Sequence, residues 1–280
     1  MQSWCRLLVA YLIVSSLLVD ADKDDEEVGN ENPFTYVRCS EKGPSNWGNL
    51  KPEWRVCRTG KLQSPINIAD SKVVVVPEIG QLRRTYTPAR ATIKNRGHDI
   101  MVKWHGDAGG VVINGTMYEL QQCHWHFPTE HTINGNRYKM ETHLVHKSSA
   151  GKVAVIGILH RLGPPDSFLE KVRLMIQLLH HVRNVSEEPT EIGIINPRDI
   201  KFGPRKYYRY IGSLTVPPCT EGVIWTILNK VKTVSIEQMR ELRDAVHDGF
   251  DDNARPIHQS HGRSIFLFLP PVHDKPSNMN

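Results

Sequence analysis

The chain has 280 residues and a mass of 31.9 kDa, enough for one large domain or two small ones. Hydrophobic residues make up 39% and charged residues 23%, which excludes disordered, collagen-like and low-complexity classes. A net charge of +5, from 35 Lys and Arg against 30 Asp and Glu, is too weak over this length to indicate nucleic-acid binding.

Residues 1–21 have the features of a secretory signal peptide. Arg6 supplies the positive charge, and the apolar run 7–19 is shorter than the about 20 residues that a membrane-spanning helix needs. We expect cleavage before Asp22, an acidic flexible segment at 22–33 and a short tail at 273–280. A membrane anchor is the alternative at the N-terminus. The signal peptide would direct the chain into the secretory pathway.

Cysteines and glycosylation sequons fit that route. Four cysteines follow the signal peptide: Cys39, Cys57, Cys123 and Cys219. An oxidising compartment favours a disulfide among them, and four cysteines allow three pairings. Sequons begin at Asn114 and Asn184, which makes both candidates for glycosylation.

Short strand-like runs dominate the rest of the chain. Runs rich in β-branched and aromatic residues, bounded by Gly, Pro, Asn and Asp, predict strands at 73–76, 91–94, 100–104, 118–125, 138–146, 153–160, 207–211, 223–228 and 264–269. Asn-Gly pairs at 114–115 and 134–135 predict hairpin turns. Apolar residues at helical spacing predict helices at 166–182 and 235–247, the second opening with a capping box of Ser235 and Gln238. This pattern predicts a single, mostly β domain with peripheral helices.

Three histidines in this pattern suggest a metal site. His124 and His126 are two apart in a predicted strand, so their imidazoles project from the same face. His143 follows in the next long strand, and the turn at 134–135 would allow the two strands to pair. Three imidazoles with an open fourth position are typical of catalytic zinc. On spacing alone, histidines that line the core or the surface are the alternative.

Two polar residues could orient these histidines. Gln122 shares a strand face with His124 and His126, and Glu141 shares one with His143. Histidines that bind a metal usually donate their second ring N–H to such a fixed acceptor.

The motifs around these residues resemble those of α-class carbonic anhydrases. They are Gln-Ser-Pro-Ile-Asn-Ile at 63–68, His124-x-His126 with Glu-His-Thr at 130–132, Glu-Thr-His-Leu-Val-His at 141–146, and Gly-Ser-Leu-Thr at 212–215 followed by Pro-Pro-Cys at 217–219. Segments 46–48 and 217–221 are most similar to the secreted plant branch. We therefore expect the extracellular space or apoplast as the destination, with a plastid reached through the secretory route as a second possibility. The resemblance implies a carbonic anhydrase domain at 34–272, built on a large, mainly antiparallel central sheet of about ten strands.

The resemblance also implies a reaction. His124, His126 and His143 would hold Zn²⁺, and zinc-bound hydroxide would attack CO2 to give bicarbonate and a proton. Thr215 would accept a hydrogen bond from the hydroxide, and Glu130 would accept one from Thr215. His98 would carry the proton away, although the charge of nearby Arg96 would oppose its protonation.

Further roles follow from the same resemblance. Tyr36 and Asn253 match polar residues near the site. The expected substrate pocket consists of Val145, Val155, Leu214, Val216 and Trp225, and Val216 stands where many members have a second Thr. Cys57 and Cys219 match the disulfide of secreted members, while Cys39 and Cys123 have no assigned partner.

Two other functions compete with this one. Some plant relatives are storage proteins, which commonly lose a zinc ligand, whereas this sequence keeps all three. A zinc-dependent hydrolase of small esters is the third possibility. The expected substrate is in any case a small molecule, and both a monomer and a homodimer are compatible with the sequence.

Overall fold

The computed structural model describes residues 33–181, 189–202, 206–246 and 252–270. The predicted signal peptide, nearly all of the acidic segment, the C-terminal tail and the Asn184 sequon lie outside these ranges. Within them, no helix is both long enough and apolar enough to cross a membrane.

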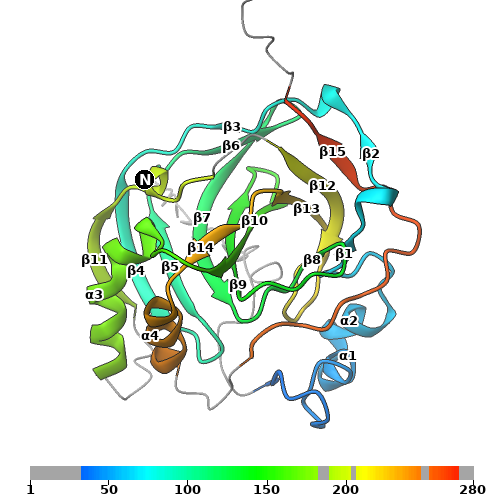
Figure 1. The fold of residues 1–280 in the computed structure, drawn as a ribbon. Helices are drawn as coiled ribbons and strands as arrows, with labels where there is room; N and C mark the ends of the chain where they lie inside the picture. Colours follow the sequence, from blue (N-terminus) through cyan, green and yellow to red (C-terminus); the bar gives the residue numbers. More distant parts are fainter. Residues whose placement is uncertain (1–32, 182–188, 203–205, 247–251, 271–280) are drawn as a thin grey trace, which may run out of the picture.

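A mixed sheet of 13 strands forms the centre of the molecule (Figure 1). Its main path runs β11 (Thr190–Ile195), β4 (Ala89–Asn95), β5 (Ile100–His105), β7 (Thr116–His126), β9 (Met140–Lys147), β10 (Val153–Leu162), β13 (Glu221–Leu228), β12 (Tyr207–Ser213), β15 (Phe266–Phe268) and β2 (Val74–Val75). Three strands join off this path: β3 (Arg83–Arg84), β6 (Gly110–Ile113) and β14 (Lys232–Val234). A separate pair consists of β1 (Asn67–Ile68) and β8 (Thr132–Ile133).

Most neighbouring strands are antiparallel. The parallel pairs in the large sheet are β10 with β13, β10 with β14, and β15 with β2. The expected mainly antiparallel central sheet is therefore confirmed, and each predicted strand overlaps an observed one. Six strands were not predicted. Four of them have only two or three residues, and a fifth, β6, has four. The sixth, β11, is longer but is an edge strand with a register shift beside Gly193.

Both predicted Asn-Gly turns are formed. Asn114 and Gly115 have φ values of 49° and 77° and close the hairpin between β6 and β7. Asn134 and Gly135, with φ values of 51° and 77°, close the short bridge between residues 133 and 136. These left-handed conformations are the ones that the tight hairpin turn requires, and Asn and Gly adopt them most readily.

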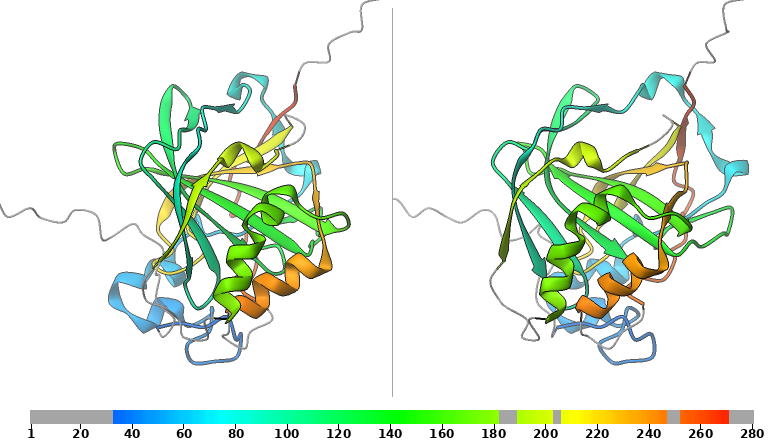
Figure 2. Two further views of the ribbon diagram at one scale, coloured as in Figure 1. Left: turned by 90° about the vertical axis from the view of Figure 1, so that its left-hand side faces the viewer. Right: turned by 60° about the vertical axis from the view of Figure 1, so that its left-hand side comes forward.

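Two helices pack side by side against the sheet, α3 (Ser167–His181) and α4 (Ile236–Val246) (Figure 2). The predicted capping box is present, because Ser235 Oγ accepts from the Gln238 N–H and Gln238 Oε1 accepts from the Ser235 N–H. Asp166 caps α3 through the N–H groups of Phe168 and Leu169. The shorter helical segments were not predicted: α1 (Trp47–Leu50), α2 (Val56–Thr59), η1 (Pro52–Trp54), η2 (Asp70–Lys72), η3 (Pro77–Ile79) and η4 (Pro197–Asp199).

The two faces of the sheet have different surroundings. Cys123 and Trp125 alternate with the histidines of β7 and pack in a large apolar cluster that includes Phe168 of α3 and Leu242 of α4. On the other face, a second cluster contains Leu214 and Trp225 of the predicted pocket. The helices thus cover one face, and the predicted chemistry lies on the other.

Acid is expected to destabilise this fold through His146, which is buried on the helix-covered side of β9. Its Nδ1–H donates to Ala154 O (3.2 Å), and its Nε2 accepts from the Tyr86 hydroxyl (2.7 Å). Burial lowers the pKa of His146 from 6.5 to about 4. The His146 imidazole therefore binds a proton more tightly in the unfolded chain than in the folded one. As the pH falls from 6.5 towards 4, the folded state loses about 3 kcal/mol of stability through this group.

Urea unfolding at pH 7 and pH 4.5 checks this expectation. The variant His146→Gln should lose less stability between the two pH values than the wild type. His105→Gln removes an exposed imidazole from β5 and should keep the wild-type dependence. An equally steep loss in His146→Gln would show that other groups carry the effect.

Candidate metal centre and active site

Three histidines meet on the face of the sheet away from the helices. Antiparallel pairing of β7 and β9 sets His124 directly opposite His143, and His126 lies one step further along the same face. The ring centroids of His126 and His143 are 4.5 Å apart, and one nitrogen from each of the three rings lies within 4.8 Å of the others. All three side chains are buried. The predicted cluster is therefore formed.

Each histidine has one ring nitrogen fixed by an acceptor. His124 Nδ1–H donates to Gln122 Oε1 (2.8 Å), and His143 Nε2–H donates to Glu141 Oε1 (3.0 Å), as expected for both partners. His126 Nδ1–H donates to the backbone oxygen of Asn253 (2.8 Å). These bonds select the tautomers that present Nε2 of His124, Nε2 of His126 and Nδ1 of His143 to a metal.

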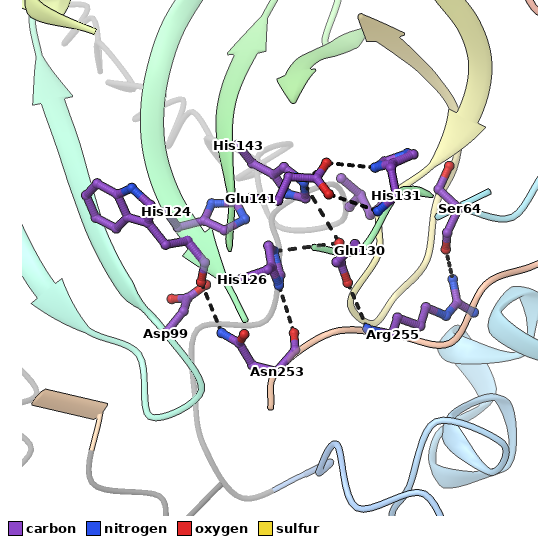
Figure 3. Close-up of polar contacts among 12 residues, drawn as sticks. Ser64, Asp99, His124, His126, Glu130, His131, Glu141, His143, Asn253 and Arg255 are labelled. Carbon is purple, nitrogen blue, oxygen red and sulfur yellow. Dashed lines mark hydrogen bonds and ion pairs between the residues drawn. The ribbon is translucent and has the colours of Figure 1, made fainter. Parts of the chain in front are cut away.

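Charges around the cluster favour a cation. Glu130 Oε2 lies 3.7 Å from His126 Nε2 and 4.0 Å from His143 Nε2 (Figure 3). Burial opposes a charge on His126, but the Glu130 carboxylate and the bond to Asn253 raise its pKa overall. The pKa of Glu141 stays well below its ordinary value, because His131 and His143 outweigh the effect of burial. Two buried carboxylates thus stand beside the three imidazoles.

This donor set fits zinc. Within the described residues, His126 Nε2 and Glu130 Oε2 are buried without hydrogen-bond partners, which is costly for a site that holds nothing else. Burial also lowers the pKa of His124 well below its ordinary value, so this ring is in the neutral form that binds a metal. Three neutral imidazoles and an open position are the ligands of catalytic zinc sites.

Thr215 and Glu130 are not hydrogen-bonded to each other in this structure. Glu130 Oε1 accepts from the Arg255 N–H (2.9 Å), and its Oε2 points towards His126 and His143 (Figure 3). Thr215 is buried in the loop between β12 and β13. The relay from Thr215 to Glu130 therefore stays a prediction.

His98 lies in the turn between β4 and β5, with only 6% of its surface exposed. Its ring packs 5.3 Å from Phe34 and 6.3 Å from Tyr36, which brings together two of the predicted residues. The positive charge of Arg96 is balanced by a carboxylate beside His98. Arg96 Nε donates to Asp99 Oδ1 (2.7 Å), and Asp99 Oδ2 lies 3.7 Å from His98 Nε2. The repulsion expected from the sequence is thus offset by a buried carboxylate.

Asn253 connects the three clustered histidines to the turn that contains His98. Its side-chain amide donates to His98 O (2.8 Å) and Trp125 O (3.0 Å), and its Oδ1 accepts from the Phe127 N–H (2.6 Å). Its own backbone oxygen orients His126. One side chain therefore fixes the end of β7, the turn of the predicted shuttle and the segment that holds a metal ligand in orientation.

Replacing Asn253 with alanine keeps the backbone oxygen that orients His126 but removes the three side-chain bonds that fix its position. Metal binding is therefore expected to weaken by about 10-fold, the lower end of the usual effect of disturbing a group that orients a ligand. The replacement should also lower stability, because each of three buried backbone groups loses its partner at a cost of about 1–3 kcal/mol. A competition titration with a zinc chelator and urea unfolding measure the two effects. Asn229→Ala, at a half-buried amide that bonds to Tyr208, is the matched control. Wild-type zinc affinity in Asn253→Ala would contradict the orienting role.

Four of the five predicted pocket residues gather beside the histidines. Val155, Leu214 and Trp225 belong to the cluster on the histidine face, and Val145 packs against it. The Trp225 ring lies 4.8 Å from that of His143. Val216 instead packs in a third cluster with the Cys57–Cys219 disulfide and Tyr36.

The other cysteines and the described sequon lie elsewhere. Cys123 is buried and unbridged, Cys39 is exposed, and Asn114 is exposed at its turn.

A second polar network was not predicted from the sequence. His131 donates from its backbone N–H and from Nδ1 to Glu141, and its Nε2 accepts from the Tyr210 hydroxyl. Tyr210 also bonds to Ser64 Oγ (2.8 Å). Arg255, fully buried, donates to Ser64 O and to Cys57 O. His131 and Ser64 lie within the recognised motifs, but Arg255 carries no local signal, because its side chain bonds to residues 191 and 198 positions away.

Comparison with known proteins places the chain in a family. The family model described as eukaryotic-type carbonic anhydrase matches residues 42–268. Alpha carbonic anhydrase 4 of Arabidopsis thaliana is 52% identical over 88% of this chain and 90% of its own length.

Two solved structures are also similar. Dioscorin, solved in complex with ascorbate, is 41% identical with a TM-score of 0.81 over 85% of this chain and 99% of its own. The carbonic anhydrase of Thermovibrio ammonificans, solved with sulfanilamide, is 34% identical with a TM-score of 0.71 over 83% of this chain and 98% of its own. The sheet, the histidine cluster and these matches agree, and the chain belongs to the eukaryotic-type carbonic anhydrase family.

Proposed function

We propose that this protein catalyses the zinc-dependent, reversible hydration of CO2 to bicarbonate and a proton. The observation that carries the proposal is the set of three buried imidazoles, each with one nitrogen fixed by an acceptor and with one nitrogen of each ring within 4.8 Å of the others. His124, His126 and His143 would hold the ion. Bound zinc would supply Lewis acidity that makes a water molecule nucleophilic near neutral pH, an effect for which carbonic anhydrases are the reference case.

The remaining residues have separate tasks. The apolar side chains of Val145, Leu214 and Trp225 favour a small neutral substrate and exclude bulk water from it. Gln122 and Glu141 hold the ligand rings in the binding tautomer. Thr215 and Glu130 would orient the attacking oxygen through hydrogen bonds.

His98 would take the released proton to solvent. Asn253 bonds to the backbone of His98 and, through its own backbone oxygen, to His126, so the turn with His98 is held beside the proposed metal site. The Asp99 carboxylate beside His98 favours the protonated ring. Such a group can act as a proton relay near neutral pH.

Stopped-flow CO2 hydration, with zinc assayed in the same sample, tests the proposal. We expect one zinc per chain and fast turnover that sulfanilamide abolishes. Full zinc content without turnover would overturn the proposal and favour a storage or binding protein; the similar structure of dioscorin was solved with a bound small molecule, ascorbate. Faster turnover of an activated ester than of CO2 would favour the small-ester hydrolase.

We also propose that the chain enters the secretory pathway, with residues 1–21 as a cleaved signal peptide. The disulfide supports this route, since such bonds persist mainly in oxidising compartments. N-terminal sequencing of the protein secreted from plant cells should give a chain that begins at Asp22. A retained Met1 would contradict this processing.

A further inference from the structure

A cationic pocket lies away from the cluster of His124, His126 and His143. It has a volume of about 330 Å³ and is lined by Arg84, Tyr86, Arg198, Lys201 and Phe202. Arg84 comes from β3, whose place beside β6 is seen in Figure 1, and Arg198 comes from η4. Three cations from two distant segments therefore line one small pocket, together with the aromatic rings of Tyr86 and Phe202.

The three cations are held in place by contacts that leave their charges uncompensated. The Arg84 guanidinium lies over the Phe202 ring, 3.9 Å from its centroid. Arg198 Nε donates to Tyr86 O (2.6 Å), and Lys201 Nζ donates to Arg198 O (3.2 Å). Among the described residues, none of the three forms an ion pair with an acid, and no acid lines the pocket. Asp199, next to Arg198, is paired with Lys171 instead.

Bringing these charges together has a cost. The side chain of Arg84 is exposed, but partial desolvation in the pocket lowers its pKa, and the charge of Arg198 lowers it further. Like charges that are held close without a counter-charge repel one another, and an anion in the pocket would relieve this repulsion. Both arginines keep Nη groups for a ligand, because Arg84 contacts Phe202 through the face of its guanidinium and Arg198 bonds to Tyr86 through Nε.

The pocket is separate from the predicted reaction. Tyr86 and Phe202 belong to the apolar cluster on the helix-covered face, together with Cys123 and Trp125. Tyr86 bonds to His146, which projects from β9 on the opposite face from His143. An anion bound here would therefore lie across the sheet from the metal ligands.

We propose that this pocket binds a phosphoryl dianion, as free phosphate or as a small phosphomonoester. Two guanidinium groups and one ammonium provide three positive charges, which a monoanionic carboxylate would leave largely uncompensated. Guanidinium forks match the geometry of phosphate oxygens and form strong charge-assisted hydrogen bonds with them. The volume is many times the about 30 Å³ of one water molecule, so a phosphoryl group with a small substituent fits.

NMR titration of the ¹⁵N-labelled, zinc-loaded chain with inorganic phosphate tests this site at constant ionic strength. Sulfanilamide is present throughout, so that phosphate at the metal does not contribute. We expect saturable shifts of the amides at 84–86 and 198–202. The affinity should fall about tenfold in Arg84→Gln and in Lys201→Gln, as expected for the loss of one charge-assisted contact. Lys201 is exposed, so its replacement leaves the core intact.

Arg58→Gln, which removes an exposed cation from α2, is the matched control and should bind phosphate like the wild type. Absence of saturable shifts at 84–86 and 198–202, or equal affinity in Arg84→Gln and Arg58→Gln, would overturn the proposal. Acetate that binds as tightly as phosphate would also overturn it. Tighter binding of glycerol 3-phosphate than of phosphate would identify a phosphomonoester as the ligand, and equal or weaker binding would identify free phosphate.

Discussion

The variant His126→Ala is expected to lose bound zinc and CO2 hydration together. His126 is one of the three proposed zinc ligands, and its Nε2 is the ring nitrogen that lies nearest the Glu130 carboxylate in a fully buried site. Removal of a group that merely orients a ligand costs about 10–100-fold in metal affinity or activity, and removal of a ligand itself should cost more. Metal analysis after dialysis against a weak chelator and stopped-flow CO2 hydration measure the two losses.

Folding of the variant must be shown separately, because alanine at a buried site leaves a cavity. Circular dichroism and urea unfolding of the metal-free proteins give that comparison. His105→Ala is the control, since it removes an exposed imidazole from β5 outside the cluster. It should keep one zinc per chain and wild-type turnover. Near-normal hydration by a folded, zinc-free His126→Ala would rule out His126 as a ligand and the metal as the source of activity.

The geometry of the histidine cluster could be predicted from the sequence because it depends on the alternation of side chains along single strands. Alternation along β7 places His124 and His126 on one face, and the polar residues two positions from His124 and His143 reach them for the same reason. The capping box of α4 and the two Asn-Gly turns are equally local. Such features need only a few neighbouring residues to be specified.

Other features depend on contacts between distant segments and could not be predicted in this way. Asn253 orients His126 across 127 positions, and Arg255 reaches Ser64 across 191. The pairing of Arg96 with Asp99 is local, but it depends on the conformation of the turn at 96–99, which the sequence pattern does not specify. The edge strand β11 was missed because none of its residues is buried and Ile194 is 72% exposed, so it lacks the buried apolar face that alternation along a strand reveals.

Loss of the Cys57–Cys219 disulfide is expected to have the largest effect on stability. The bond joins residues 162 positions apart, so it restricts the unfolded chain strongly. Chain-entropy arguments give about 5 kcal/mol for a loop of this length, and native disulfides typically contribute about 2–5 kcal/mol. Both cysteines are buried with Trp47 and Val216. Alanine is therefore the better replacement, because a serine hydroxyl in this cluster would add the cost of a buried polar group.

The double variant Cys57→Ala/Cys219→Ala should lose about 2–5 kcal/mol of unfolding free energy in urea, and reduction of the wild type should give a similar loss. Cys39→Ser, at an exposed cysteine, should leave the stability unchanged. Because Arg255 connects Cys57 O to Glu130, the double variant should also lose activity at a lower temperature than the wild type. An unchanged urea midpoint would mean that the packing of this cluster, and not the covalent bond, holds the Thr215 loop against the core.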